Sequence, residues 1–216
     1  GDRLFSGLAT STVSARGTPF ELDPLCLAGA EPQALVLRSA SAAATDLIAD
    51  RLRALGLEHV HDGPTDPEQA SLLLGSPAGL VDYGIVVIAG ELDWTRVLTG
   101  PSALNGLRDL LARGGGLVLS PLAWPILAAL APDAMPTAPA TGLGGSALAT
   151  PSDALQAELM WDSVSLMLPQ DGPLFEASGK HVLLRAIVPV LEGGERDVAL
   201  LLRVPVGLGR IVLSAF

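Results

Sequence analysis

Cysteine, lysine and aromatic residues are scarce in this chain of 216 residues. Cys26 is the only cysteine, so the sequence holds neither an internal disulfide framework nor a cysteine-based metal site. Lys180 is the only lysine, and no stretch of sequence gathers basic residues. With 13 Lys and Arg against 23 Asp and Glu the net charge is −10, which argues against nucleic acid or an anionic membrane as a partner.

Long apolar runs are also missing. The longest, Leu122–Ala131, is interrupted by Pro125 and is much shorter than the roughly 18–20 residues that cross a bilayer. No succession of basic, apolar and small residues marks a signal peptide, although the start at Gly1 leaves processing of the N-terminus open. We therefore predict no membrane span and a cytoplasmic location.

The chain is instead rich in small and aliphatic residues. Hydrophobic residues make up 49% of it and charged residues 17%, below the usual quarter or so, which predicts a large packed core rather than disorder. So few charges also predict that part of the surface is covered, either by a protein partner or by another copy of the chain.

The pattern along the chain changes at residue 33. Residues 1–32 show no clear period and contain three prolines, which predicts an N-terminal arm or peripheral strand. Residues 33–216 are predicted to form one α/β domain, because short apolar runs alternate there with segments of helical spacing. Strands are predicted at 34–38, 57–60, 83–89 and 117–119, and helices at 43–55, 67–74, 104–111 and 121–131. This alternation predicts a parallel sheet with right-handed crossovers.

The last third of the chain has a different pattern. Residues 132–152 are rich in Pro, Ala, Thr, Gly and Ser and hold a single charge, which predicts a loop insertion. Strand-like runs follow at 182–191, 198–204 and 210–213. The Gly-containing connections between them predict antiparallel hairpins, and so a β-rich C-terminal part.

Three segments together carry a resemblance to a known family. Asp82–Ile88 joins an Asp-Tyr pair to an apolar strand, Leu107–Ser120 is a helix, three glycines and a strand, and Val198–Ser214 closes with a Gly-Leu-Gly-Arg turn before an apolar strand. This order resembles the class I glutamine amidotransferase-like superfamily, in particular its non-amidotransferase, ThuA-like members. The resemblance covers roughly residues 33–125 and 180–216. It implies a flavodoxin-like parallel sheet with flanking helices.

The resemblance also shows where catalytic residues would lie. Class I amidotransferases carry a cysteine nucleophile on a sharp strand-to-helix elbow. This chain has Ser120 at that point, followed by Pro121, which has no N–H to donate to an oxyanion. Amidotransferase chemistry is therefore not expected. Ser120 either acts as a nucleophile or caps the next helix, and no cofactor is predicted.

Two further patterns each have two interpretations. His59 and His61 form a His-x-His pair that either binds a metal or lies at a solvated strand end before a turn. Ser39 and Ser41 lie where the first predicted strand meets the first helix, where they either bind an anion or cap the helix.

Ligands of open α/β sheets bind at the carboxyl ends of the strands. Besides Ser39 and Ser41, these ends carry Glu91 and Asp93, which either contact a polar ligand or serve the local turn. Trp94 and Trp124 either form the wall of a pocket or pack on the sheet.

Three functions are compatible with these observations. The first is a catalytically inert amidotransferase-like domain that serves as a protein-interaction or scaffold module, and the sequence favours it. The second is a domain that binds a small molecule such as a sugar or nucleotide. The third is a hydrolase that uses Ser120 or a metal on His59 and His61.

Overall fold

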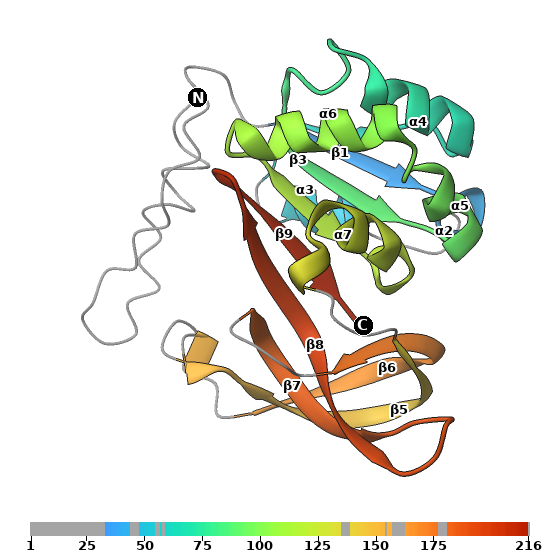
Figure 1. Ribbon diagram of the computed structural model, residues 1–216, viewed down its shortest axis with the longest axis vertical. Helices are drawn as coiled ribbons and strands as arrows, with labels where there is room; N and C mark the ends of the chain where they lie inside the picture. Colours follow the sequence, from blue (N-terminus) through green and yellow to red (C-terminus); the bar gives the residue numbers. More distant parts are fainter. Residues whose placement is uncertain are drawn as a thin grey trace.

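The computed structural model describes most of the chain after residue 32. The described residues are 33–43, 48–54, 57, 59–134, 139–153, 155–156, 163–176 and 181–215. The predicted N-terminal arm at 1–32 lies outside them. In Figure 1 the described part has an upper region of strands and helices and a lower region of strands, and β8 (Glu195–Val206) extends from one into the other.

Five neighbouring strands are parallel to one another. Their order is β2 (Val60–Asp62), β1 (Gln33–Arg38), β3 (Tyr83–Ala89), β4 (Gly116–Leu119) and β9 (Gly209–Ser214). These strands are short and rich in Val, Leu and Ile, as expected for strands buried on both faces. The strand predicted at 83–89 is confirmed, whereas the second strand occupies 60–62 rather than 57–60.

Helices pack against both faces of these strands. The helices are α2 (Ala40–Ala43), α3 (Ile48–Ala54), α4 (Pro67–Gly75), α5 (Leu92–Val97), α6 (Pro101–Ala112) and α7 (Trp124–Leu130), with short 3-10 turns η1 (Pro121–Ala123) and η2 (Pro132–Ala134). Leu35 and Leu37 of β1 face the larger core, which includes residues of α4, α6 and α7, and Ala34 and Val36 face a smaller core with Ala49 of α3. None of the described helices is long and apolar enough to cross a membrane.

The remaining strands are antiparallel and form a closed barrel. β8 pairs with β6 (Val164–Glu176), β6 with β5 (Ala140–Pro151), β5 with β7 (Val182–Pro189), and β7 again with β8. Closure leaves these four strands with no free sheet edge along the paired segments. A second cluster of buried apolar residues from all four fills the barrel.

The predicted fold class is therefore wrong. A flavodoxin-like parallel sheet does not describe the chain, because its longest strands are antiparallel and four of them close into the barrel. The loop insertion predicted at 132–152 is wrong as well, since residues 140–151 form β5. In this strand Ala147 and Ala149 are buried whereas Leu148 is exposed. Small residues thus occupy the core positions, and the alternation of apolar and polar residues that marks a strand is hidden.

Helices α4 and α6 cross at very close range. A Cβ atom added at Gly106 of α6 would lie 1.8 Å from the carbonyl oxygen of Leu74 in α4. Leu74 is fully buried in the larger core, so the backbones cannot separate without disturbing that core. Only glycine permits this contact.

We predict that Gly106→Ala lowers the free energy of unfolding by about 1–3 kcal/mol, the usual cost of overpacking. Chemical denaturation followed by circular dichroism measures this change. Gly116→Ala is the control, since its added Cβ would find no atom nearer than 3.9 Å. Equal stability of the two variants would contradict the close-contact explanation.

Glu192 joins the β7–β8 hairpin to the start of β5. Its carboxylate accepts a hydrogen bond from the backbone N–H of Thr141 at 3.0 Å, and Leu191 N–H donates to the Thr141 carbonyl at 2.8 Å. Hydrogen bonds from its own backbone N–H and from Thr141, helped by the charge of Arg196, hold the pKa of the Glu192 carboxyl below its ordinary value of 4.5.

This depressed pKa predicts a pH-dependent effect of Glu192→Gln. The ionised carboxylate stabilises the fold above the unfolded pKa, near 4.5, and that contribution disappears as the pH falls through the lower folded pKa. The variant should therefore be less stable than the wild type at neutral pH and equally stable in strong acid. Unfolding curves across this range test it, with Glu195→Gln in the same hairpin as control. A difference that persists unchanged in strong acid would refute the role of the charge.

Candidate functional site

The carboxyl ends of β1, β3 and β4 lie side by side and bring the predicted polar residues to one edge. Ser39 follows β1 and donates its backbone N–H to the Ala89 carbonyl at the end of β3, at 3.1 Å. Ser120 follows β4 and donates its backbone N–H to Ile88 at 2.9 Å. The parallel register therefore places these loops next to one another, as predicted from the strand pattern.

Ser39, Ser41 and Glu91 form a chain of hydrogen bonds at this edge. Ser41 donates its hydroxyl proton to the Glu91 carboxylate, and the Ser39 and Ser41 hydroxyl oxygens are 3.1 Å apart. Because Ser41 has only one proton to give, Ser39 must donate to Ser41. Ser39 is 4% exposed and accepts the backbone N–H of Ala42 at 3.4 Å, so it also caps the short helix α2.

This proton order decides which ligands the cluster can attract. Both hydroxyl protons point toward Glu91, so the cluster is one of acceptor oxygens around a carboxylate. Ser39 makes a capping contact with Ala42, whereas Ser41 lies inside α2 and bonds to Glu91.

Asp93 and Trp94 lie in α5 and point in different directions. The Asp93 side chain is 91% exposed and pairs with Arg96 on the same helix, at 3.0 Å. Trp94 is buried, and its indole N–H donates to the carbonyl oxygen of Thr65 at 2.7 Å. Its ring also lies against Gly90, where an added Cβ would come within 2.7 Å of the ring. These contacts give Trp94 a packing role and leave Asp93 outside the serine cluster.

Thr95 is a residue at this edge that sequence reasoning missed. Its side chain is fully buried, and its hydroxyl oxygen lies 2.9 Å from the Leu92 carbonyl and 2.8 Å from the Leu122 carbonyl. The second contact joins α5 to the turn that follows β4. A buried hydroxyl two residues beyond Asp93 carries no distinctive sequence signal, because threonine on an apolar helix face is common.

Ser120 lies in ordinary extended backbone. Its φ and ψ are −69° and 166°, and although it is the N-cap of η1, its side chain makes no capping hydrogen bond. A nucleophile elbow is by contrast a sharp, strained turn. Among the described residues other than glycine, only Asp171 has a positive φ. Neither the strained elbow nor a donor N–H at Pro121 is thus present beside Ser120.

Trp124 contacts the barrel. Its ring centroid lies 6.3 Å from that of Phe175 in β6, and the half-buried indole packs on the larger core. The tryptophan predicted either to line a pocket or to pack on the sheet therefore joins the helical region to the barrel.

The two histidines lie at the other side of the sheet, on and just before its edge strand β2. Both are exposed, and the His61 ring meets the Tyr83 ring edge-on, with 5.7 Å between centroids. Within the described ranges, no group of three or more His, Cys, Asp or Glu side chains is arranged to hold a metal ion.

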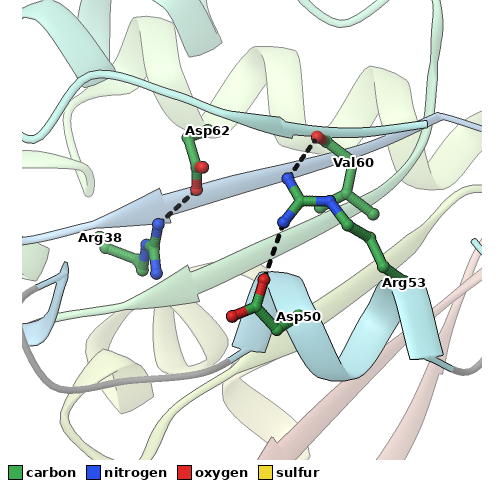
Figure 2. Close-up of polar contacts among 5 residues, drawn as sticks. All are labelled: Arg38, Asp50, Arg53, Val60 and Asp62. Atoms are coloured by element: carbon green, nitrogen blue, oxygen red, sulfur yellow. Dashed lines mark hydrogen bonds and ion pairs between the residues drawn. The ribbon is translucent and has the colours of Figure 1, made fainter. Parts of the chain in front are cut away.

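Ion pairs and hydrogen bonds stabilise the edge of the sheet that β2 forms. Figure 2 shows Arg38, at the end of β1, paired with Asp62 of β2, while Arg53 of α3 joins Asp50 to the Val60 carbonyl. The distances from Arg53 are 3.0 Å to Asp50 and 3.3 Å to Val60. These contacts hold a strand of only three residues and its covering helix in place.

The fold defined by these parallel and antiparallel strands is that of the ThuA-like and glutamine amidotransferase proteins. A ThuA-like protein from Parabacteroides merdae has 15% identity and a TM-score of 0.60, over 85% of this chain and 79% of its own. Another from Bacteroides uniformis has 11% identity and a TM-score of 0.57, over 93% and 86%. A glutamine amidotransferase from Thermotoga maritima has 14% identity and a TM-score of 0.54, over 86% and 75%.

These likenesses confirm the predicted resemblance at the level of the fold. No family model matches the sequence, and no curated protein matches it. At such low sequence identities, these likenesses establish the fold of the chain and say nothing about its chemistry.

The double contact of Thr95 generates a prediction. Thr95→Val keeps the shape of the side chain but removes a fully buried hydroxyl and its hydrogen bond to the Leu122 carbonyl, so we expect a loss of about 0.5–1.5 kcal/mol of stability. Thermal and denaturant unfolding measure it. Thr99→Val is the matched control, because the Thr99 hydroxyl bonds only locally to the Arg96 carbonyl and is more exposed. An effect no larger than the control's would show that the contact to Leu122 contributes nothing.

Proposed function

We propose that this chain is a catalytically inert amidotransferase-like domain whose function is to bind another protein through the outside of its barrel. The observation that carries the proposal is an apolar stripe on the barrel surface. It consists of Leu148, Met167 and Ile187, which are 67%, 72% and 69% exposed. Large aliphatic side chains gathered at such exposure are typical of an interaction surface.

The residues at the elbow support the absence of catalysis. The only cysteine, Cys26, lies far upstream of the elbow in the sequence, and Ser120 has unstrained backbone and is followed by Pro121. Without an activated nucleophile and a neighbouring N–H donor, acyl-transfer chemistry has neither of its two essential parts.

Exposed apolar residues are concentrated on the barrel. Five of the nine large exposed hydrophobic residues among the described positions lie in β5–β7 or the hairpin that follows. These five are Leu143, Leu148, Met167, Ile187 and Leu191. A fold that merely tolerated exposed leucines would scatter them, so their concentration supports a function for this face.

Polar groups on the same face are paired with one another. The hydroxyls of Ser146 and Ser165 lie 3.1 Å apart beside the stripe, and Arg185 pairs with Asp197 at 3.5 Å. Groups that already have partners lose less when a protein covers them and removes water. This pairing lowers the cost of burying the face.

Small-molecule binding is a second candidate, and the Ser39–Ser41–Glu91 cluster favours it. Its carboxylate and hydroxyl oxygens are of the kind that accept hydrogen bonds from a ligand such as a sugar. Ligand-dependent thermal stabilisation, lost in Glu91→Ala, would distinguish this candidate from the first.

The first proposal predicts that Leu148→Glu abolishes the assembly in which the protein occurs in its source cells. A carboxylate at the middle of the stripe must be desolvated on binding, which is costly. Native mass spectrometry of gently isolated protein measures the assembly. Leu72→Glu is the matched control, since Leu72 is 74% exposed but lies in α4. A monomeric wild-type protein, or an assembly that survives Leu148→Glu, would refute the proposal.

A further inference from the structure

We infer that His59 and His61 together bind one divalent transition-metal ion at the sheet edge formed by β2. Zn²⁺, Ni²⁺ and Cu²⁺ are ions of this class, because imidazole nitrogen is a preferred ligand for each of them. The site is separate from the apolar stripe of the proposed function, since it lies beside the parallel strands and the stripe lies on the barrel. Either conclusion can therefore fail without the other.

The two histidines project from the same face of the sheet. The His59 carbonyl accepts the backbone N–H of Ala34 at 2.9 Å, which continues the pairing of β2 with β1. Val60, between the histidines, is buried in the smaller core with Ala34. Because successive side chains of a strand alternate between its faces, His59 and His61 both lie on the opposite face. His61 pairs with Leu35, whose side chain belongs to the larger core on that face.

This spacing lets both imidazoles reach one ion. Residues two positions apart on a strand are separated by roughly 6.6 Å, twice the rise per residue. Metal–nitrogen bonds of about 2.0–2.1 Å hold two ligand nitrogens roughly 3–3.5 Å apart. Each side chain therefore has to lean inward by only about 2 Å, much less than the length of a histidine side chain. Both side chains are exposed, so an ion reaches them from solvent.

The surroundings of the pair are compatible with a cation. The Tyr83 ring meets the His61 ring edge-on and limits its orientations. Asp62 follows His61 and so takes the face of Val60, where it pairs with Arg38. The positive charge of Arg38 is thus neutralised on the other face of the sheet. A net charge of −10 on the chain also attracts divalent cations from solution.

Two protein ligands define a site for an exchangeable ion. Structural zinc sites are closed by four protein ligands, and catalytic ones have three and keep one position open. In the part of the chain that the structure describes, no third His, Cys, Asp or Glu side chain joins the pair. Water, or a group on another molecule, takes the other coordination positions. Removal of the ion by a chelator should therefore leave the circular dichroism spectrum unchanged.

Calorimetric titration of Zn²⁺ into the purified full chain, prepared without a histidine tag and stripped of metal, tests this inference. We expect one ion at the pair and a dissociation constant that rises at least about tenfold in His59→Ala and in His61→Ala. His181→Ala and Cys26→Ser are the controls and should bind as the wild type does. They replace the only other histidine and the only cysteine. Circular dichroism verifies that each variant is folded.

The double variant distinguishes chelation by the pair from binding at two independent histidines. In a chelate the second imidazole binds the ion intramolecularly, so loss of either one removes most of the affinity. Each single variant should therefore bind nearly as weakly as the variant that lacks both His59 and His61. Independent histidines would instead bind two ions in the wild type and one in each single variant, which would contradict a shared site.

Nuclear magnetic resonance of the wild-type chain makes the test independent of any folding defect in the variants. With only three histidines, the imidazole proton signals can be assigned one by one. One equivalent of Zn²⁺ should shift or broaden the signals of His59 and His61 together and leave those of His181 unchanged. A chelator should restore the original spectrum.

Three outcomes overturn the metal site. They are Zn²⁺ binding that survives in both single variants, Zn²⁺ binding that Cys26→Ser removes, and unchanged His59 and His61 signals at a large excess of Zn²⁺. None of them bears on the protein-binding function, whose test is the effect of Leu148→Glu on the assembly.

Discussion

The arrangement of the whole molecule depends on β8, which contributes to two cores. Ala199, Leu202 and Val204 pack in the larger core with the helices, whereas Val198 and Leu200 pack inside the barrel. Its first half pairs with β6 and β7, and its second half pairs with β9 beside the parallel strands. Val198, Leu200, Leu202 and Val204 follow one another at two-residue spacing, so one face of β8 passes from the barrel core into the larger core and joins the two regions without a separate linker.

Contacts at the end of the chain strengthen this joint. Ala215 donates its backbone N–H to the Leu200 carbonyl at 2.9 Å, and Trp124 packs on Phe175. The barrel is consequently held beside the carboxyl ends of the parallel strands, the edge where ligands of α/β sheets usually bind. The stripe residues lie in β5, β6 and β7, and Figure 1 shows β5 and β6 in the lower region, apart from β9.

Local pattern was sufficient for the central strands of the α/β region. Tyr83–Ala89 and Leu117–Leu119 are continuous apolar runs, and a strand buried on both faces needs only such a run. The residues of the carboxyl edge could be placed for the same reason, because parallel strands end at a common edge. The hydrogen-bond partners of these residues could not be predicted, because the bond from Ser41 to Glu91 joins residues 50 positions apart.

What the sequence alone determined is thus the strand–helix alternation, the resemblance in fold and the lack of an amidotransferase nucleophile. Each follows from residue type and short-range order. The barrel and its apolar stripe were decided only by tertiary structure. Whether Leu148 is buried or exposed depends on which strands lie on either side of β5, and Ala147 and Ala149 hid the pattern by filling the core with small side chains. The barrel is closed by the pairing of β5 with β7 and of β6 with β8, which joins residues far apart in the sequence, such as Thr150 and Arg185, and no local period encodes it.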